Sequence, residues 1–371
     1  MDATLYTQVF EALRARIESG DLEVGAKLPA QNELAASFGV SVITIKHALA
    51  LLHDAGYIER RPRIGSVVVS TVPTRSGRRV LPTIGCILTN FDDSFGTRVL
   101  HGLLDASIGV ANVVLSRTEG HHDREQQLIA QYEHLDGLIL LPSSSDWIPP
   151  AILQLVHQEH PLVILDRLLV GLPISTVCSD HVGAGRQAAE HLFALGHRDI
   201  GLVTSAGQVS SLDDRHSGFV YAHAARGHTF DPRHEFRDVR STVPHSTASM
   251  DDDVAALKEF VKATPELTGF VGGEYSVSLL LRRACLELGM RVPQDVSIVS
   301  LDSPDNAYDD AAQVFTHVSQ DEPGLGRAAL SGVLAQLAAR GSIVKSVLPT
   351  TLVVGETTQE VTPGVKTTAD R

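Results

Sequence analysis

The sequence is poor in cysteine and aromatic residues and contains no long apolar run. Its 371 residues include three cysteines and one tryptophan, and aromatic residues make up 5%. Cys86, Cys178 and Cys285 are too widely spaced to predict a disulfide framework or a four-thiolate metal site. No apolar stretch approaches the roughly 18 residues that a membrane span needs, and the amphipathic N-terminus is unlike a signal peptide. These absences exclude membrane, secreted disulfide-rich and zinc-ribbon proteins and predict a cytoplasmic protein.

What the sequence does contain is a globular composition with an uneven charge. Hydrophobic residues make up 43% and charged residues 20%, which predicts two or three domains with sizeable cores. Residues 1–82 hold ten Lys and Arg against eight Asp and Glu, a net charge of +2, whereas residues 83–371 carry a net charge of −15. This asymmetry is expected when only one end of a protein meets a polyphosphate.

The first 70 residues show the pattern of a small α+β domain. Apolar residues at helical spacing predict helices over 5–17, 31–38 and 42–55. Short β-type runs at 57–59 and 66–69 flank an Arg-rich turn and predict a β-ribbon. Three helices followed by a β-ribbon indicate a winged helix-turn-helix.

The third helix of this domain has the pattern of a DNA recognition helix. Ser41 is a good N-cap, and burial of the apolar stripe leaves Val42, Ile43, Lys46 and His47 outward, with Thr44 at the edge. The predicted wing adds Arg60, Arg61 and Arg63, which suit phosphate contacts or entry into the minor groove. The alternative is a small helical interaction domain whose arginines are merely solvated.

From residue 83 onward short apolar runs alternate with helical stretches. Strands are expected at 84–89, 113–116, 138–141, 162–165, 175–178, 200–204, 269–272 and 296–301. Helices are expected near 96–109, 123–134, 149–159, 183–195, 213–226, 248–263, 275–289 and 323–340. This alternation predicts an α/β body with parallel sheets covered by helices on both faces, and its length favours two doubly wound lobes. Residues 71–82 are expected to form a linker, and residues 359–371 a polar tail.

The head resembles the DNA-binding domain of the GntR family of bacterial transcription factors. The resemblance covers residues 5–69 and rests on Gly20-Asp-Leu-x-x-Gly25-x-x-Leu-Pro29, Glu33-Leu-Ala, Gly39-Val-Ser41, Ala48-Leu and Gly56-Tyr-Ile-Glu. Lys46 and Thr44 match the family pattern. The family usually carries arginine where this chain has Asn32 and Val42. The resemblance therefore implies a DNA-binding role for these positions, but the operator sequence cannot be transferred from relatives.

The body resembles the effector domains of LacI/GalR-type regulators over roughly residues 83–357. The matching stretches include Leu135-Asp136-Gly137, His191-Leu-x-x-Leu-Gly196-His197-Arg198, Arg215-x-x-Gly218-Phe219, Leu288-Gly289-x-x-Val-Pro293-x-Asp295 and Leu301-Asp302. This resemblance implies a periplasmic-binding-protein-like fold. The first lobe would comprise about 83–178 plus 316–342, and the second about 179–315 plus 343–358. A GntR head on such a body is the layout of arabinose-repressor-like regulators.

The resemblance also implies a ligand cleft between the lobes. A neutral polyol is held by many directed hydrogen bonds and an aromatic face, and Arg and carboxylate side chains can each hold two adjacent hydroxyls. The residues expected at the cleft by family position are Asp92, Phe95, Asp166, Arg215, Glu274 and Asp302, and Trp147 could stack on a ring. Glu274-Tyr275 replaces the Asn-Asp pair common in relatives.

Each expected ligand contact has a purely structural alternative. Arg215 could form a surface ion pair, and Asp302 could cap the next turn. Asp166 and Arg167 could form an internal ion pair at the crossover between lobes, and Trp147 could seal a lobe edge.

No motif predicts a cofactor, a metal site or an enzyme. Gly183-Ala-Gly185 imitates a dinucleotide fingerprint, but no acidic residue ends the next strand, so close helix packing is the better interpretation. The seventeen histidines, His121 and His122 among them, form no metal-ligand spacing. A P-loop and a GxSxG elbow are also absent.

We therefore expect a dimeric, DNA-binding transcription regulator, a repressor released from operator DNA by a small sugar. One alternative is the same architecture sensing a purine or a sugar phosphate as corepressor. A second is a sugar-binding transport protein or a sugar-modifying enzyme, which the DNA-binding head and the lack of a catalytic constellation disfavour.

Overall fold

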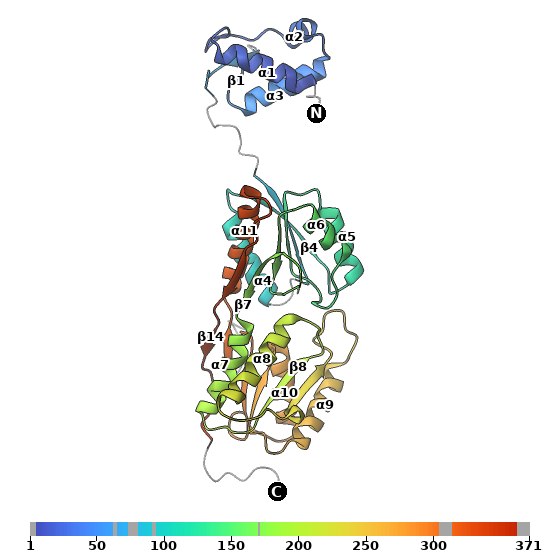
Figure 1. The fold of residues 1–371 in the computed structure, drawn as a ribbon, viewed down its shortest axis with the longest axis vertical. Coiled ribbons are helices and arrows are strands. Elements are labelled where there is room, and N and C mark those ends of the chain that lie inside the picture. Colours follow the sequence, from blue (N-terminus) through green and yellow to red (C-terminus); the bar gives the residue numbers. More distant parts are fainter. Residues whose placement is uncertain are drawn as a thin grey trace. The chain divides into compact units, whose positions relative to one another are not determined.

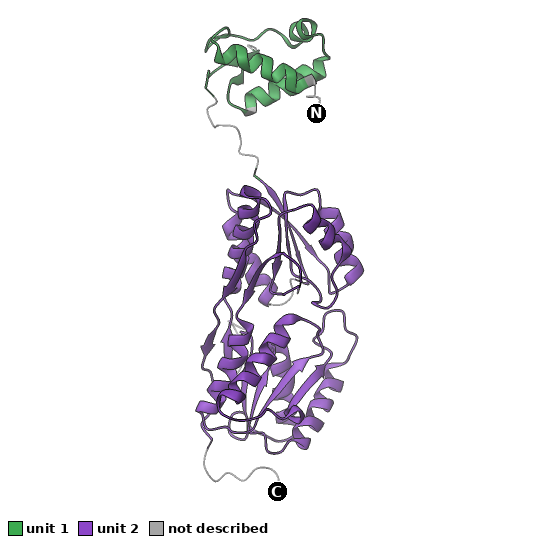
Figure 2. Cartoon of the chain, viewed as in Figure 1, with its two compact units in different colours: residues 1–81 green, residues 82–371 purple. Residues whose placement is uncertain are grey.

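The chain forms two compact units, residues 1–81 and 82–371 (Figure 2). The computed structural model describes residues 5–61, 65–72, 81–90, 94–169, 171–303 and 314–361. Two residues expected at functional sites, Arg63 and Asp92, lie outside the described residues.

The N-terminal unit has the predicted helices and ribbon. It contains α1 (Leu5–Glu18), α2 (Gln31–Phe38), α3 (Val42–Asp54), β1 (Ile58–Arg61) and β2 (Gly65–Val68). The two strands pair antiparallel. Leu13 and Ile17 of α1, Leu34 of α2, and Ile45 and Leu49 of α3 are buried in one cluster, which joins the three helices into one core. The winged helix-turn-helix is thereby confirmed, with the apolar stripe of α3 turned inward.

The turn between α2 and α3 follows from two residues. Gly39 ends α2 with φ of 66°, a left-handed conformation that glycine adopts without strain. The Ser41 hydroxyl then accepts the backbone N–H of Thr44 at 3.1 Å and begins α3. The turn therefore fixes the direction in which α3 leaves α2.

The second unit consists of two six-stranded sheets with helices on both faces (Figure 1). The first sheet has the order β13-β7-β6-β5-β3-β4. Its strands are β3 (Thr83–Leu88), β4 (Asn112–Arg117), β5 (Gly137–Leu140), β6 (Leu162–Leu165), β7 (Ser175–Ser179) and β13 (Lys345–Leu348). All pair in parallel.

The second sheet has the order β14-β12-β11-β10-β8-β9. Its strands are β8 (Ile200–Ser205), β9 (Glu235–Val239), β10 (Gly269–Gly272), β11 (Ser297–Ser300), β12 (Thr316–Ser319) and β14 (Thr351–Val353). Only β14 pairs antiparallel, with β12.

The helices of the body pack on the sheets of the two lobes through their apolar residues. The first lobe carries α4 (Ser94–Ser107), α5 (His122–Tyr132), α6 (Pro150–His157) and α11 (Glu322–Ala338). The second carries α7 (His181–Ala194), α8 (Ser210–Ala225), α9 (Met250–Ala263) and α10 (Tyr275–Glu287). In each lobe one helix pair covers each sheet face, which gives four separate apolar clusters in the body. The predicted doubly wound α/β architecture is confirmed.

The predicted lobe boundaries are wrong for two strands. Residues 316–319 were expected in the first lobe, but they form β12 in the second sheet. Residues 345–348 were expected in the second lobe, but they form β13 in the first sheet. The chain crosses between the lobes after β7, after β12 and after β13. Both strands are only four residues long, and their pattern does not specify the sheet that they join.

Glycines allow one close helix pair in each lobe. A Cβ on Gly326 would lie 2.1 Å from the Val99 carbonyl oxygen, so α11 and α4 touch through their backbones. A Cβ on Gly218 would lie 1.9 Å from the Val182 carbonyl oxygen, where α8 crosses α7. Gly185 contacts the Arg215 backbone in the same crossing, which supports the packing interpretation of the glycines at the start of α7.

Within the described ranges no single helix is long and apolar enough to cross a membrane. The pair α2 and α3 meets the length and hydropathy requirement jointly, but it is bent by 108°.

The helix crossing in the first lobe is testable with two substitutions on one helix. Gly326→Ala should lower the free energy of unfolding by about 1–3 kcal/mol, because the new methyl group meets backbone that cannot yield. Gly332→Ala on the same helix places its Cβ 3.1 Å from Val163 Cγ2. Its cost should be offset by the helix propensity of alanine, about 0.8–1.0 kcal/mol over glycine. Thermal unfolding followed through Trp147 fluorescence measures both, and equal effects would contradict the close crossing.

Candidate functional site

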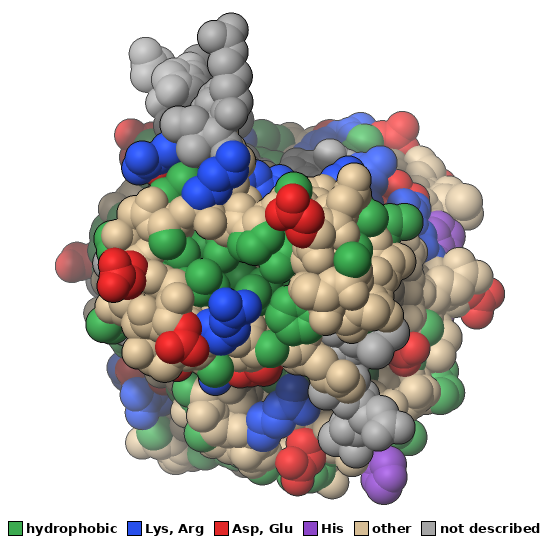
Figure 3. Space-filling view, turned by 90° about the horizontal axis from the view of Figure 1, so that it is seen from above, with side chains coloured by type: hydrophobic (Ala, Val, Ile, Leu, Met, Phe, Trp, Pro, Cys, Tyr) green, Lys and Arg blue, Asp and Glu red, His purple; other side chains and the backbone are tan. Residues whose placement is uncertain are grey.

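The exposed face of the helix-turn-helix carries the side chains predicted to meet DNA. Val42, Ile43, Lys46 and His47 on α3 are exposed, and Ile43 is 67% accessible. Asn32 is exposed at the start of α2. Figure 3 shows Lys and Arg side chains beside a central group of hydrophobic side chains on this unit. The surface therefore offers both charge and apolar contact at the N-terminal end of α3.

Several of these predicted side chains also have partners within the protein. The Ser41 and Thr44 hydroxyls lie 2.8 Å apart and form a hydrogen bond. The His47 ring meets the Tyr6 ring edge to face, with 6.0 Å between centroids. Ser41 and Thr44 therefore shape the helix start, and α1 restricts the His47 ring.

The wing presents its arginines differently. Arg60 and Arg61 are both exposed on β1. Arg61 Nε donates to Glu59 Oε2 at 3.0 Å, an exposed ion pair that solvent screens. Arg61 is thus partly neutralised by its neighbour.

In the second lobe Arg215 and Asp302 form the centre of a buried polar cluster. Arg215, on α8, is 5% exposed. Its Nη2 donates to Asp302 Oδ1 at 2.8 Å, and its Nη1 donates to Asp302 Oδ2 at 3.1 Å. Nη1 also donates to the carbonyl oxygens of Gly273 and Leu301. This two-pronged geometry fixes the plane of the guanidinium. Arg215 is therefore not the surface ion pair of the structural alternative.

Asp302 connects this cluster to the crossover between the lobes. Gln320, directly after β12, donates from Nε2 to Asp302 Oδ1 at 2.6 Å. The Asp302 side chain keeps 26% of its surface exposed, whereas that of Arg215 keeps 6%. The carboxylate of the pair is therefore more exposed to solvent than its cation.

Asp166 joins the cluster from the first lobe. It follows β6 with φ of 53°, and its Oδ1 lies 2.7 Å from His181 Nε2 at the start of α7. Arg167 Nη1 donates to Asp166 Oδ2 at 2.6 Å and to Ser211 Oγ on α8 at 3.1 Å. Burial alone would raise the pKa of Asp166, but His181, Arg167 and Arg215 together lower it to about 2. Asp166 and Arg167 thus form an internal ion pair. The lobes are joined here by the contacts of Asp166 with His181 and of Arg167 with Ser211.

Glu274 lies beside this cluster at the N-cap position of α10. Its Oε2 accepts the backbone N–H of Ser205 at 3.3 Å, and its side chain does not cap the helix. Burial raises the pKa of Glu274, and neighbouring Arg215 opposes that rise. The carboxylate therefore occupies the end of the second sheet next to Arg215.

Phe95 and Trp147 lie in the first lobe, apart from this cluster. Phe95 is half-buried and packs against the core beneath α4. The Trp147 indole stacks on the His122 ring, with 4.4 Å between centroids and 8° between planes. One indole face is thus covered by His122, and no described contact connects Trp147 to Arg215 or Asp302.

The lobes also touch at the side where Trp147 lies. Ser145 N–H and Ser144 Oγ both donate to the Gln208 carbonyl oxygen, and Ser210 N–H donates to Ser145 Oγ at 2.8 Å. The Ser143 hydroxyl and N–H donate to Glu125 Oε2, which pins this loop to α5. The two lobes are therefore in direct contact on this side as well as at the crossover.

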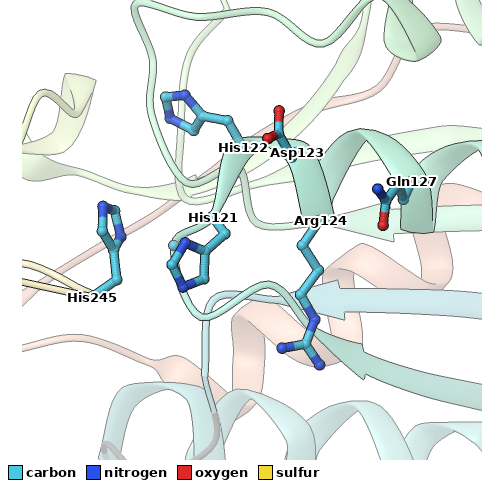
Figure 4. A pocket seen from close by; sticks show the side chains of 7 residues that line it. His121, His122, Asp123, Arg124, Gln127 and His245 are labelled. Carbon is cyan, nitrogen blue, oxygen red and sulfur yellow. The ribbon is translucent and has the colours of Figure 1, made fainter.

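A cavity of about 560 Å³ lies where the start of α5 faces the second lobe (Figure 4). It is lined by Gly120, His121, His122, Asp123, Arg124, Gln127 and His245. The His121 and His245 rings stack across the lobes with 4.8 Å between centroids. Among the residues that the structure describes, no group of three or more His, Cys, Asp or Glu could hold a metal ion.

Sequence reasoning missed His181 and Gln320, the two side chains that extend the Arg215–Asp302 cluster. His181 follows the N-cap Asp180, and Gln320 precedes the N-cap Asp321. Both caps lie where the chain crosses between lobes. A strand end followed by an Asp N-cap is therefore the sequence signal that could have identified His181 and Gln320. Two buried polar atoms near these crossings, Arg167 Nε and Gln320 Oε1, have no hydrogen-bond partner among the described residues.

Comparison with known proteins agrees with this two-part architecture. Residues 172–358 match the periplasmic binding protein-like domain family, and residues 5–68 match the gntR family of bacterial regulatory proteins. The arabinose metabolism transcriptional repressor of Geobacillus stearothermophilus is 25% identical over 305 residues, covering 80% of this chain and 81% of that protein. The HTH-type transcriptional regulator CelR of Thermobifida fusca is 26% identical over 271 residues, covering 69% and 76%.

Solved structures share the fold. A complex of the transcriptional regulator CelR with cellobiose superposes with a TM-score of 0.64 at 22% identity, covering 89% of this chain and all of that one. A LacI family regulator from Enterococcus faecium with bound ribose gives a TM-score of 0.62 at 20% identity, covering 76% and 100%. The chain therefore belongs to the periplasmic binding protein-like family, and with its gntR-family head it is a DNA-binding transcription regulator rather than an enzyme.

Proposed function

We propose that this regulator is a cytoplasmic, dimeric repressor released from operator DNA when a small neutral sugar binds between its two lobes. Residues 1–70 would bind DNA, residues 71–82 would link the two units, and residues 83–358 would sense the ligand. Relatives support the ligand class, because the CelR neighbour was solved with cellobiose and a LacI family neighbour with ribose.

The observation that carries the sugar proposal is the Arg215–Asp302 pair. The pair is buried on its cationic side, and its partly exposed carboxylate can accept hydrogen bonds from adjacent hydroxyls. Glu274 and Asp166 add further acceptors, whereas Phe95 and Trp147 offer apolar faces from the first lobe. We propose all six as ligand contacts, with Asp92 as a seventh from outside the described residues.

The same pair argues against an anionic effector. A phosphate would have to displace Asp302 from Arg215, or approach a carboxylate that already occupies the guanidinium. A sugar phosphate or purine corepressor is therefore the second candidate. It would be favoured only if a part of the cleft other than Arg215 bound the charge of the ligand.

Ligand would act by shifting the population of lobe arrangements. Three crossings and the contacts between Ser145, Gln208 and Ser210 join the lobes, so a ligand that bridges them changes their relative position. In a dimer this movement alters the spacing of the two heads, and half-sites about one helical turn apart tolerate little error.

Calorimetry with L-arabinose, D-ribose, cellobiose, adenine and glucose 6-phosphate tests the ligand class. We expect heat from at least one neutral sugar, and the same sugar should release the protein from DNA selected out of a random pool. Heat from the phosphate or purine alone would replace the sugar proposal with its alternative.

The DNA face is tested by the salt dependence of binding. If Lys46 and Arg60 bind phosphates, Lys46→Ala and Arg60→Ala should each weaken binding and reduce the slope of log K against log salt by about 0.9 for each phosphate left without its cation. Arg233→Ala, in the second lobe with a side chain 80% exposed, is the matched control. An unchanged slope in the Lys46 and Arg60 variants would exclude them from the interface.

The ligand site is tested by Arg215→Lys. A lysine ammonium cannot serve Asp302, two carbonyl oxygens and His181 in the planar pattern of a guanidinium. Loss of one charge-assisted hydrogen bond, about 1.5–3 kcal/mol, should weaken sugar binding at least about tenfold. Affinity for DNA without sugar should not change. Arg233→Lys serves as control, and wild-type sugar affinity in the Arg215 variant would remove Arg215 from the site.

A further inference from the structure

His181 is buried between a carboxylate of one lobe and a guanidinium of the other. It is 3% exposed and begins α7 directly after the crossover from β7. Its Nε2 lies 2.7 Å from Asp166 Oδ1, and its Nδ1 lies 3.3 Å from Arg215 Nε. The imidazole thus spans from the end of β6 in the first lobe to α8 in the second.

The partners of this ring permit only one neutral form. The Arg215 Nε–H is a donor and has no capacity to accept, so His181 Nδ1 must be the bare nitrogen. Nε2 then carries the proton and donates to Asp166, whose ionised carboxylate only accepts. Both ring nitrogens are used, and the hydrogen-bond sequence Asp166–His181–Arg215–Asp302 is continuous.

We propose that His181 is a positioning residue that sets the orientation of the Arg215 guanidinium toward the effector and couples that orientation to the lobe crossover. The proposal rests on the proposed role of Arg215 in ligand binding. The Arg215 Nη atoms are held by Asp302 and by two carbonyl oxygens, all from the second lobe. The bond to Nε leads instead to the first lobe, through His181 and Asp166. A movement of Asp166 is therefore transmitted to Arg215.

The contact with Arg215 requires this neutral form of the ring. A proton on Nδ1 would place two N–H donors against each other at the Arg215 contact and break it.

Two substitutions separate hydrogen bonding from packing. His181→Gln keeps one donor and one acceptor, whereas His181→Leu fills the space without either. In calorimetry of the full chain with L-arabinose, D-ribose and cellobiose, the leucine variant should bind at least about tenfold more weakly. The glutamine variant, which can still donate to Asp166 and accept from Arg215, should stay within about threefold of wild type. His157→Gln and His157→Leu, at an exposed position on α6, are the controls.

Wild-type sugar affinity in the leucine variant would overturn the proposal, and so would a glutamine variant as weak as leucine. Circular dichroism and DNA binding report whether each variant folds.

A ligand-free measurement keeps this proposal distinct from the sugar proposal. In a ¹⁵N-histidine correlation spectrum of the full chain, the ring signal that disappears in His181→Gln should show protonated Nε2 and bare Nδ1 near neutral pH. If no sugar binds the wild type, the sugar proposal fails while this spectrum still decides the His181 geometry. The opposite tautomer, or an imidazolium at neutral pH, would overturn the positioning role.

Discussion

The body is organised around the need to satisfy a buried guanidinium. Arg215 has five N–H groups and almost no exposure to solvent, and an unpaired charge of this kind would cost several kcal/mol. Its partners come from four places: the end of β10, the end of β11, the start of α7 and, through His181, the end of β6. The first three of these places lie in the second lobe, and the last lies at the end of a strand of the first sheet. The hydrogen bonds of Arg215 therefore hold the carboxyl ends of these strands close together.

The two crossing helices share one design. Residues 180–185 and 321–326 both read Asp-x-x-Gly-x-Gly. In each, the Asp carboxylate accepts the N–H of the first glycine, at 2.7 Å for Asp180 and 2.8 Å for Asp321. The second glycine allows backbone contact with a neighbouring helix, α8 or α4. Each helix follows a strand of the opposite lobe, so a short rigid unit begins directly where the chain changes lobes. Motion at the crossover is consequently passed to α7 and α11 as whole helices.

The sequence predicted those helices and strands in which buried side chains recur at a regular spacing. The helices of both units have helically spaced apolar residues, and the central strands have continuous apolar runs. Their bounds were therefore predicted closely. β9, β13 and β14 were missed because they are edge strands with largely exposed or partly exposed residues, as in Lys345–Leu348. β12 is short, and its core position depends on Thr316, a buried threonine whose N–H and hydroxyl bond to Thr357 and Thr358. Sequence pattern does not distinguish this threonine from an exposed one.

The candidate site was predictable in part for a related reason. Arg215 and Asp302 were expected from the resemblance, and the structure brings them together. His181 was not expected, because a histidine at a helix start has no pattern that separates a capping role from a bridge between lobes. The stacking of Trp147 on His122 was missed likewise, since it joins a loop residue to the first residue of α5, and these two residues share no periodicity.

The contacts between the lobes set the task that an effector must perform. In the present arrangement Ser144 and Ser145 bond to Gln208 and Ser210, and Arg167 bonds to Ser211. A change in lobe position breaks these bonds, and each replaced bond contributes only about 0.5–1.5 kcal/mol net. A ligand with several hydroxyls can offset such losses one by one at both lobes, because each hydroxyl donates and accepts. A single charged group cannot, since Asp302 already neutralises Arg215. The energetics of lobe movement and the chemistry of the cleft thus favour the same class of ligand.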